Sequence, residues 1–235
     1  MRLHRFIGDY DLTSDHLKIK DSDLTNQVRN VLRLKKGDEI ILADGNLNEA
    51  RTKVSEISKD VVEVDIVEKW HNQNESESDV VLYCAILKRE NFELVVQKAT
   101  EIGAKKIVPI ITERTVKLDI RPDRLQKIIR EAGEQSGRGK LPILSDTVEF
   151  SDAIGTLSGN GLNLFFDKSG ESFTTISRQD NVSRTGIWIG PEGGWTDQEV
   201  ESARSAGFKI LNLGKLTLRA ETAAITASFA VVNKF

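Results

Sequence analysis

The sequence feature that most constrains the fold is a pair of apolar runs that each end abruptly at a glycine. The first run, at residues 187–189, leads into Gly-Pro-Glu-Gly-Gly at residues 190–194. The second, at residues 210–213, leads into Gly214 and then into an alanine-rich segment that begins after Arg219. Short apolar runs bounded by glycine are typical of buried strands. The sequence therefore predicts two strand-to-loop corners that can together form one small-molecule pocket.

A helix start is predicted directly after the first corner. Thr196 is followed three residues later by Glu199, which is the spacing of a capping box. The first N–H groups of such a helix have no partner within the helix and can bind a polar or anionic group.

The pattern of elements divides the chain into two predicted domains. Residues 70–79 (WHNQNESESD) are strongly polar and form the best linker candidate. Before them, predicted strands at 39–43 and 61–67 and a short amphipathic helix within 21–34 indicate a small, barrel-like β domain. We place the boundaries of the domains at 1–70 and 80–235, with the linker at 71–79.

Strands and helices alternate in the second predicted domain, which indicates an α/β fold with a parallel sheet covered on both faces. The predicted strands are apolar throughout and cover residues 80–87, 106–111, 162–166, 186–189 and 209–213. The predicted helices cover residues 90–102, 122–136, 197–206 and 220–233.

Charge and composition exclude several classes of protein. The formal net charge of −3 argues against a general polyanion binder, although eight basic and four acidic residues between 114 and 140 form a local basic group. No apolar run is long enough to span a membrane, and the N-terminus lacks the apolar core of a signal peptide. We therefore expect a cytoplasmic protein with no membrane partner.

The residues that most often perform metal or nucleophilic chemistry are badly placed here. The histidines are His4, His16 and His71, all outside the predicted α/β domain, so neither a metal site nor a Ser-His-acid triad is expected. Cys84 is the single cysteine and lies in a predicted buried strand. The glycine motifs of P-loops and of classical dinucleotide sites are absent. These absences favour a ligand that carries its own reactive group and is positioned by the protein.

Five motifs occur in one order along the chain: KATEIG at 98–103, TERT at 112–115, EQSGR at 134–138, IGPEGG at 189–194 and LG…LRAETA at 213–223. Together they resemble the bacterial 16S ribosomal RNA (uridine-N3) methyltransferases of the RsmE type, which belong to the SPOUT superfamily of S-adenosylmethionine-dependent enzymes. In the N-terminal part, VLRLKKGD at 31–38 resembles the PUA-like RNA-binding domain of that family.

The resemblance implies a PUA-like β-barrel followed by an α/β domain with a trefoil knot, in a homodimer that binds S-adenosylmethionine in the knot. It also implies a set of cofactor-binding residues: Phe166, Gly190, Pro191, Glu192, Gly193, Gly194, Leu213, Gly214 and Leu218. The sequence departs from the family pattern at Asn26, where a histidine is frequent, and at Thr217, where an aliphatic residue is usual.

Methylation of uridine N3 needs a group that helps to remove the N3 proton, and a cation that stabilises the resulting anion. Our catalytic candidates are Arg219, Arg138, Lys98 and Glu221. A surface ion pair of Lys98 with Glu101 is an alternative for Lys98, and phosphate contact or solvation is an alternative for Arg138. Arg5, Arg29, Arg33 and Lys35 are the candidate RNA contacts.

We therefore expect a methyltransferase that uses S-adenosylmethionine, needs no metal, and modifies N3 of a uridine in 16S rRNA, either free or in the small ribosomal subunit. Because N3 lies on the Watson–Crick edge, the base must leave its pair before it reacts. Two alternatives stay open at this point. The chain can be an RNA-binding or ribosome-assembly protein of the same fold without methyl transfer, or a methyltransferase of another RNA atom, such as a ribose 2′-hydroxyl.

Overall fold

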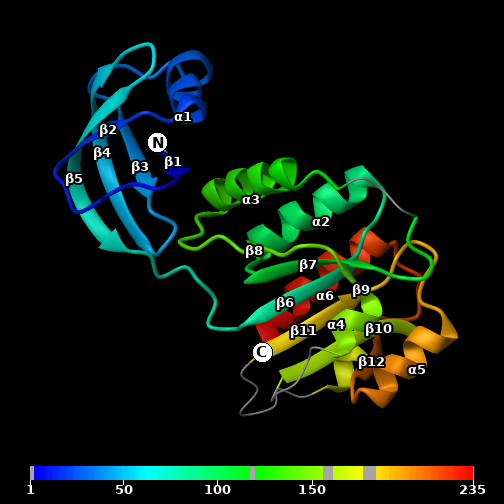
Figure 1. Ribbon diagram of the computed structural model, residues 1–235. Helices are drawn as coiled ribbons and strands as arrows, with labels where there is room; N and C mark the ends of the chain where they lie inside the picture. Colours follow the sequence, from blue (N-terminus) through cyan, green and yellow to red (C-terminus); the bar gives the residue numbers. More distant parts are fainter. Residues whose placement is uncertain (1–2, 117–119, 156–160, 177–183, 235) are drawn as a thin grey trace. The chain divides into compact units, whose positions relative to one another are not determined.

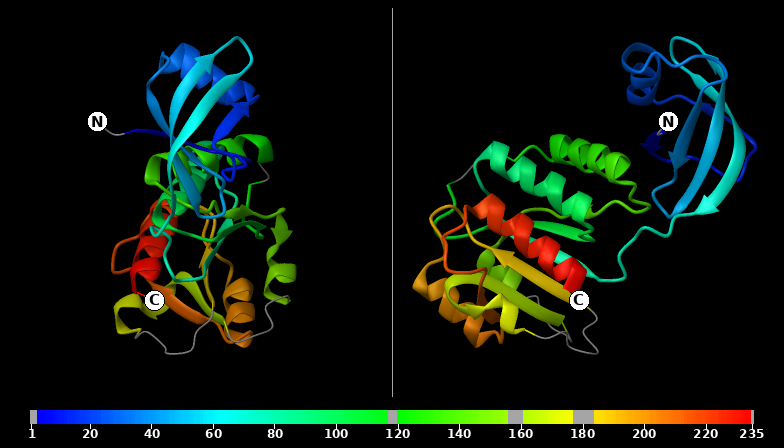
Figure 2. Two further views of the ribbon diagram at one scale, coloured as in Figure 1. Left: turned by 90° about the vertical axis from the view of Figure 1, so that its left-hand side faces the viewer. Right: turned by 180° about the vertical axis from the view of Figure 1, so that it is seen from behind.

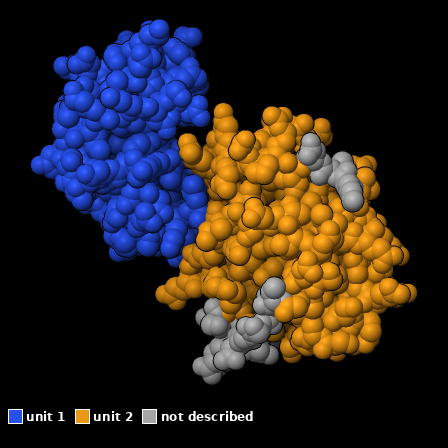
Figure 3. Space-filling view, in the orientation of Figure 1, with its two compact units in different colours: residues 1–75, 133–141 blue, residues 76–132, 142–235 orange. Residues whose placement is uncertain are grey.

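The computed structural model describes residues 3–116, 120–155, 161–176 and 184–234. It divides the chain into two compact units, coloured separately in Figure 3. The first unit contains Met1–Glu75 and Gly133–Leu141, and the second contains Ser76–Ala132 and Pro142–Phe235. Residues 133–141 therefore belong to the first unit, although the residues before and after them in the sequence belong to the second.

The first unit is built on a five-stranded mixed sheet with the order β1-β3-β4-β5-β2 (Figure 1). β3, β4 and β5 form an antiparallel meander, β1 pairs parallel to β3, and β2 pairs antiparallel to β5. The bounds are β1 His4–Ile7, β2 His16–Ile19, β3 Glu39–Ala43, β4 Asn48–Ile57 and β5 Val62–His71.

Local sequence explains the turn and the helix of this unit. The Asp44 carboxylate accepts hydrogen bonds from the backbone N–H groups of Asn46 and Asn48, which closes the turn between β3 and β4. α1 (Ser22–Asn26) lies within the predicted range 21–34 and is capped by the side chain of Asp21. The chain then continues in the wider π-helix η1 (Gln27–Val31) instead of one regular α-helix.

The second unit contains a parallel sheet with the order β12-β10-β11-β6-β7-β8, and β9 also pairs with β7. This confirms the predicted α/β architecture with a parallel sheet. The strand bounds are β6 Val80–Ala85, β7 Lys106–Ile111, β8 Ile143–Leu144, β9 Val148–Glu149, β10 Gly161–Ser172, β11 Arg184–Ile189 and β12 Lys209–Asn212.

Helices cover both faces of this sheet (Figure 2). On one face, α6 packs against α2 and against strands β6 and β11. On the other, side chains of α4 and α5 join alternate residues of the strands in one core cluster, which includes Val81, Val108, Phe165 and Trp188. The helix bounds are α2 Arg89–Ile102, α3 Pro122–Ser136, α4 Phe150–Gly155, α5 Asp197–Ser205 and α6 Ala220–Lys234; the short 3₁₀-helix η2 covers Phe173–Thr175.

Trp188 lies at the centre of the second core. It is fully buried, and its ring stacks on Tyr83 at a centroid distance of 4.0 Å. The Phe150 ring stands nearly perpendicular to it, with the two centroids 6.0 Å apart. Its indole N–H donates to the Asn163 side chain at 3.1 Å, so the one polar atom of the ring is satisfied.

No helix within the described part of the chain has the length and apolar character needed to cross a membrane.

Trp188→Ala is expected to destabilise the second unit by about 3–5 kcal/mol, because it leaves a large cavity and an unpaired Asn163. Urea denaturation followed by far-UV circular dichroism measures this change. Ile143→Ala is the control, since its side chain is 65% exposed and should cost less than about 0.5 kcal/mol. Equal costs for the two variants would contradict the central role of Trp188.

Candidate functional site

The register of the parallel sheet brings the two predicted corners to one edge. β10 lies between β11 and β12, and its residue Phe166 pairs with Ile189 on one side and with Leu211 on the other. Neighbouring strands are about 4.8 Å apart, so the two corners are separated by roughly 10 Å. The two corners therefore lie at the same edge of the sheet, one strand apart. That they form one small-molecule pocket stays a prediction.

The first corner folds back on its own tryptophan. The Gly194 N–H donates to the Pro191 carbonyl at 2.8 Å, and Gly194 has a φ of +69° that glycine adopts without strain. The Trp195 ring packs under Gly190, where an added Cβ would lie 2.9 Å from the ring. Its indole N–H donates to the Phe166 carbonyl at 3.1 Å, which ties this corner to β10.

The helix start after this corner is a capping box, as predicted. The Thr196 hydroxyl accepts from the Glu199 N–H at 3.3 Å, and the Glu199 carboxylate accepts from the Thr196 N–H at 2.8 Å. The other oxygen of Glu199 accepts from the N–H of Glu113, in the loop after β7, at 3.0 Å. Glu199 therefore also joins two loops, a role that its position in the motif does not reveal.

Two further contacts fix the first corner to neighbouring strand ends. The Arg114 guanidinium donates to the carbonyls of Gly193 and Trp195 at 2.9 and 3.1 Å. The Lys88 N–H, in the loop after β6, donates to the Glu192 carboxylate at 3.0 Å. The TERT motif at 112–115 is one signal of the family, but it does not reveal this role of Arg114.

The second corner is organised by Asn212. Its side chain donates to the Gly170 carbonyl at 2.6 Å and accepts from the Gly214 N–H at 3.0 Å. Gly214 is exposed with a φ of +127°, and Leu213 and Leu218 are partly buried. The loop thus presents backbone groups toward solvent at the edge of the sheet.

The segment after this loop begins α6 and contains two of the predicted catalytic residues. Arg219 is exposed, and Glu221 is only 8% exposed. The Glu221 Oε2 atom is buried and has no hydrogen-bond partner among the residues that the structure describes. A buried carboxylate oxygen without a donor is costly, so a ligand that offers a proton or a positive charge would stabilise it.

The other two predicted catalytic residues lie in different units. Lys98, on α2 of the second unit, pairs with Glu101 at 2.9 Å with a partly exposed ammonium group. Arg138 belongs to the first unit, is 5% exposed, and donates to both oxygens of Glu75 at 2.7 and 2.9 Å. Arg138 is therefore a buried ion-pair residue, not a solvated one.

The predicted RNA contacts differ in exposure. Arg29, Arg33 and Lys35 are exposed around the end of η1 and the loop that follows it. Arg5 is mostly buried and forms an ion pair with Glu49, which is 1% exposed.

No metal-binding group is found among the described histidine, cysteine and acidic side chains. Cys84 is fully buried in β6, and this burial raises the pKa of its thiol far above the ordinary value. The thiol is therefore neutral near pH 7 and unsuited to nucleophilic work.

Comparison with known proteins identifies two family models along the chain. An RNA methyltransferase domain matches residues 74–232, and an RNA methyltransferase PUA domain matches residues 28–67. A ribosomal RNA small subunit methyltransferase E of Rickettsia conorii is 34% identical over 92% of this chain and 86% of its own. The Bacillus subtilis protein of the same name is 31% identical, over 88% and 86%.

Solved structures agree over almost the whole chain. A ribosomal RNA small subunit methyltransferase E of Neisseria gonorrhoeae bound to S-adenosyl methionine superposes with a TM-score of 0.91 at 28% identity, covering 99% of this chain and 98% of that one. A putative methyltransferase of Legionella pneumophila, in complex with the same cofactor, gives a TM-score of 0.89 at 29% identity over 99% and 98%.

Cys84 is expected to resist alkylation by iodoacetamide in the folded protein at pH 8, because a raised pKa keeps the thiol protonated and the strand excludes the reagent. The unfolded chain in guanidinium chloride should instead react at its single thiol. Mass spectrometry of the alkylated chain measures both. Rapid labelling of the folded protein would show that β6 is accessible.

Proposed function

This chain belongs to the RNA methyltransferase family, and we propose that it transfers a methyl group from S-adenosylmethionine to N3 of a uridine in 16S rRNA. The observation that carries the proposal is the pair of glycine corners held one strand apart at the carboxyl edge of the parallel sheet. Ligands of α/β sheets bind at this edge. The similarity to two solved structures that contain S-adenosylmethionine supports this cofactor.

The residues at the edge fit a nucleoside with a sulfonium group. Gly193, Gly194 and Gly214 carry no side chain, so a ligand can approach the backbone of both corners closely. Phe166 lies on the strand between the corners. The unpartnered Glu221 oxygen offers an acceptor beside the second corner. We assign the cofactor to Phe166, residues 190–194, Leu213, Gly214 and Leu218.

S-adenosylmethionine supplies the activated methyl group and the leaving group, so the protein has to align the reactants and exclude water. Its residues must also deal with the N3 proton. We propose that Glu221 accepts that proton or orients the group that does, and that the exposed Arg219 stabilises the negative charge that develops on the uracil carbonyls.

Lys98 and Arg138 are the remaining catalytic proposals. Lys98 has a partly exposed ammonium group whose pairing with Glu101 can be exchanged for a contact with the substrate. Arg138 already donates to both oxygens of Glu75, so its part in the reaction rests on the resemblance alone.

We propose that the first domain is a PUA-like barrel that binds RNA through Arg5, Arg29, Arg33 and Lys35. The PUA model match covers the last three of these, which are exposed, and Arg5 would first have to leave Glu49. The proposed boundaries stay at 1–70, 71–79 and 80–235, with 133–141 packed on the first unit.

The family relationship also suggests a trefoil knot, a homodimer and a cytoplasmic location. The chain leaves β11 for α5 and leaves β12 for α6, and both connections start at the same edge of the sheet. For the homodimer, α6 offers Phe229, which is 61% exposed, and the loop before α6 offers Leu216, which is 83% exposed.

Two measurements test the proposed function. Calorimetric titration with S-adenosylmethionine should show one site, and mapping of modified nucleosides in small-subunit RNA should show a methyluridine that is lost when the protein is removed. Absence of binding at millimolar cofactor would leave an RNA-binding protein without methyl transfer. A methylated ribose in place of a methylated base would assign the reaction to another atom.

Gly190→Ala is expected to weaken S-adenosylmethionine binding at least about tenfold, which corresponds to roughly 1.4 kcal/mol. The added methyl group would push the Trp195 ring away from its bond to Phe166 and distort the corner. Gly155→Ala is the matched control, because a Cβ there meets no atom within 4 Å. Calorimetry compares the two, and equal affinities would remove the first corner from the cofactor site.

Arg219→Ala is expected to lower turnover on RNA by roughly 10²-fold while cofactor affinity and fold are retained, since the lost cation acts mainly on the transition state. Lys209→Ala removes the same charge at the opposite end of β12 and should leave turnover within about twofold. Methyl incorporation from labelled cofactor measures both rates. An unchanged rate for Arg219→Ala would exclude this residue from the mechanism.

A further inference from the structure

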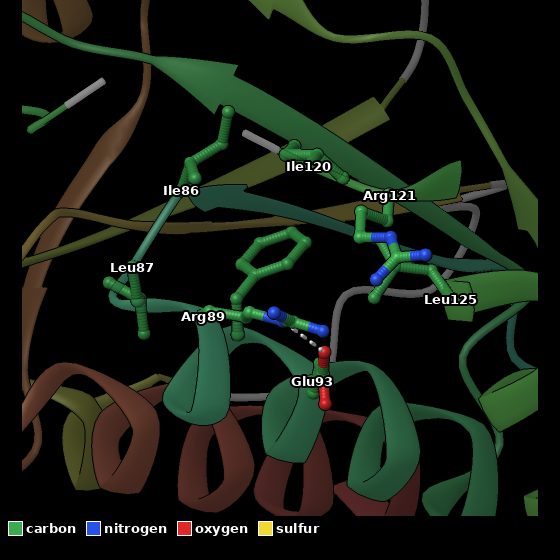
Figure 4. Close-up of a pocket in the computed structure, with 8 residues that line it drawn as sticks. Ile86, Leu87, Arg89, Glu93, Ile120, Arg121 and Leu125 are labelled. Atoms are coloured by element: carbon green, nitrogen blue, oxygen red, sulfur yellow. Dashed lines mark hydrogen bonds and ion pairs between the residues drawn. The ribbon is translucent and has the colours of Figure 1, made fainter. Parts of the chain in front are cut away.

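A second hollow opens in the second unit, outside the two glycine corners. Its walls come from the end of β6, the first turns of α2, and the segment that leads into α3 (Figure 4). The hollow encloses about 290 Å³ of empty space, open solvent at its mouth included. Because that figure counts open solvent, the hollow is a shallow apolar surface against which a flat ring can lie, and not an enclosed pocket. The lining residues are Ile86, Leu87, Arg89, Phe92, Glu93, Ile120, Arg121 and Leu125.

The hollow lies at the same edge of the sheet as the corners. β6 pairs with β11 through Cys84 and Ile189, so the end of β6 is one strand, about 4.8 Å, from the end of β11. The Lys88 N–H, directly after the lining residue Leu87, donates to Glu192 of the first corner. A group in the hollow therefore lies beside the proposed cofactor site.

Its floor is apolar, because Leu87, Phe92 and Leu125 are buried and make up the inner wall. Its rim is cationic. Arg89 and Arg121 approach from α2 and from the segment before α3, and both are exposed. An apolar floor with arginines at the mouth suits a ring that carries an anionic group.

The cations at the rim are held in place by one carboxylate. Glu93 accepts from Arg89 at 3.1 Å and from Arg124 at 2.5 and 2.7 Å. These hydrogen bonds, that from Arg124 first, lower the pKa of Glu93, so it stays ionised at neutral pH. Arg121 has no ion-pair partner among the described residues. Glu131 also acts on Arg124, so Arg121 is the rim cation that remains available to an anionic group.

The start of α2 already has negative charge beside it. Lys88 and Arg89 stand at the N-terminus of this 14-residue helix, where positive charge opposes the helix dipole. Glu90 in the same turn and the Glu192 carboxylate, which accepts from the Lys88 N–H, offset that charge. The attraction for an anion therefore comes from the arginines at the rim.

We propose that this hollow binds one nucleotide of the RNA substrate, with the base on the apolar floor and an adjoining phosphate on Arg89 and Arg121. The assignment rests on the proposed function for the identity of the RNA. An unstacked base is stabilised by an apolar surface as large as its ring, and the phosphodiester next to it is stabilised by cations at the border of that surface. A free phosphate would not need the floor, and an apolar peptide would not need the arginines.

The test compares two variants of the full chain that lose the same charge near the same helix. Arg121→Ala removes a lining cation, and Arg130→Ala removes an exposed α3 cation that does not line the hollow. Fluorescence anisotropy with a short uridine-containing single-stranded RNA is measured at two salt concentrations. Arg121→Ala should bind about fivefold more weakly and lower the salt slope by about 0.7, while Arg130→Ala stays within about twofold.

Crosslinking tests the position of the base. A 4-thiouridine in the same RNA should crosslink to peptides that contain residues 86–93 or 120–125, and Ile120→Phe, which narrows the hollow without changing charge, should reduce both crosslinking and affinity. Calorimetry with S-adenosylmethionine should give the same affinity for Arg121→Ala and for the unmodified chain. A chain that binds RNA at the hollow but no cofactor would refute the proposed function and leave this site standing.

Three results would overturn the site. Equal losses of RNA affinity in Arg121→Ala and Arg130→Ala would show that RNA is attracted by the general positive charge and not by a specific site in the hollow. Crosslinks found only outside 86–93 and 120–125 would place the base elsewhere. Altered self-association of Ile120→Phe in sedimentation, with RNA affinity unchanged, would make the hollow a protein contact.

Discussion

The candidate site depends on one constraint, the position of β10 between β11 and β12. Because Phe166 pairs with both neighbours, two corners that are about twenty residues apart in the sequence lie one strand apart in space. Contacts with three other segments then hold the first corner. Its own Trp195 donates to the Phe166 carbonyl in β10, Arg114 donates from the loop after β7, and Lys88 donates from the loop after β6. Because these contacts fix the backbone of the corner, its glycines leave space for a ligand without loss of local structure.

Polar contacts also hold a segment of the backbone in place in the first unit. Residues 133–141 contribute few apolar side chains, and they are held mainly by hydrogen bonds. The Glu75 carboxylate pairs with Arg138 and accepts from the N–H groups of Gly139 and Lys140, and Asn72 donates to the Gly137 carbonyl. Such bonds are directional, so they set the register of the segment more strictly than a sliding apolar contact would.

Local rules predicted the elements whose signals are contained in a few residues. The capping box at Thr196 and strand β7 lie where they were predicted, and α2 ends at the predicted Ile102 and begins one residue early, because caps and continuous apolar runs act over one turn or one strand. Strands β1, β2 and β4 were missed. β4 carries Glu49, Arg51, Lys53 and Glu56 among its ten residues, and the pairing with β3 and β5 that makes it a strand is non-local. The same limit applies to Arg114 and Glu199, whose partners lie some eighty residues away.

The return of residues 133–141 to the first unit has a consequence for how such a protein can be divided or recombined. The chain passes between the units after residues 75, 132 and 141, three times in all. A gene fragment cut in the polar segment near residue 75 would encode an N-terminal piece that lacks the partners of Glu75 and Asn72. Exchange of one half by genetic recombination at that point would therefore produce chimaeras with an incomplete first unit, which favours inheritance of the two halves together.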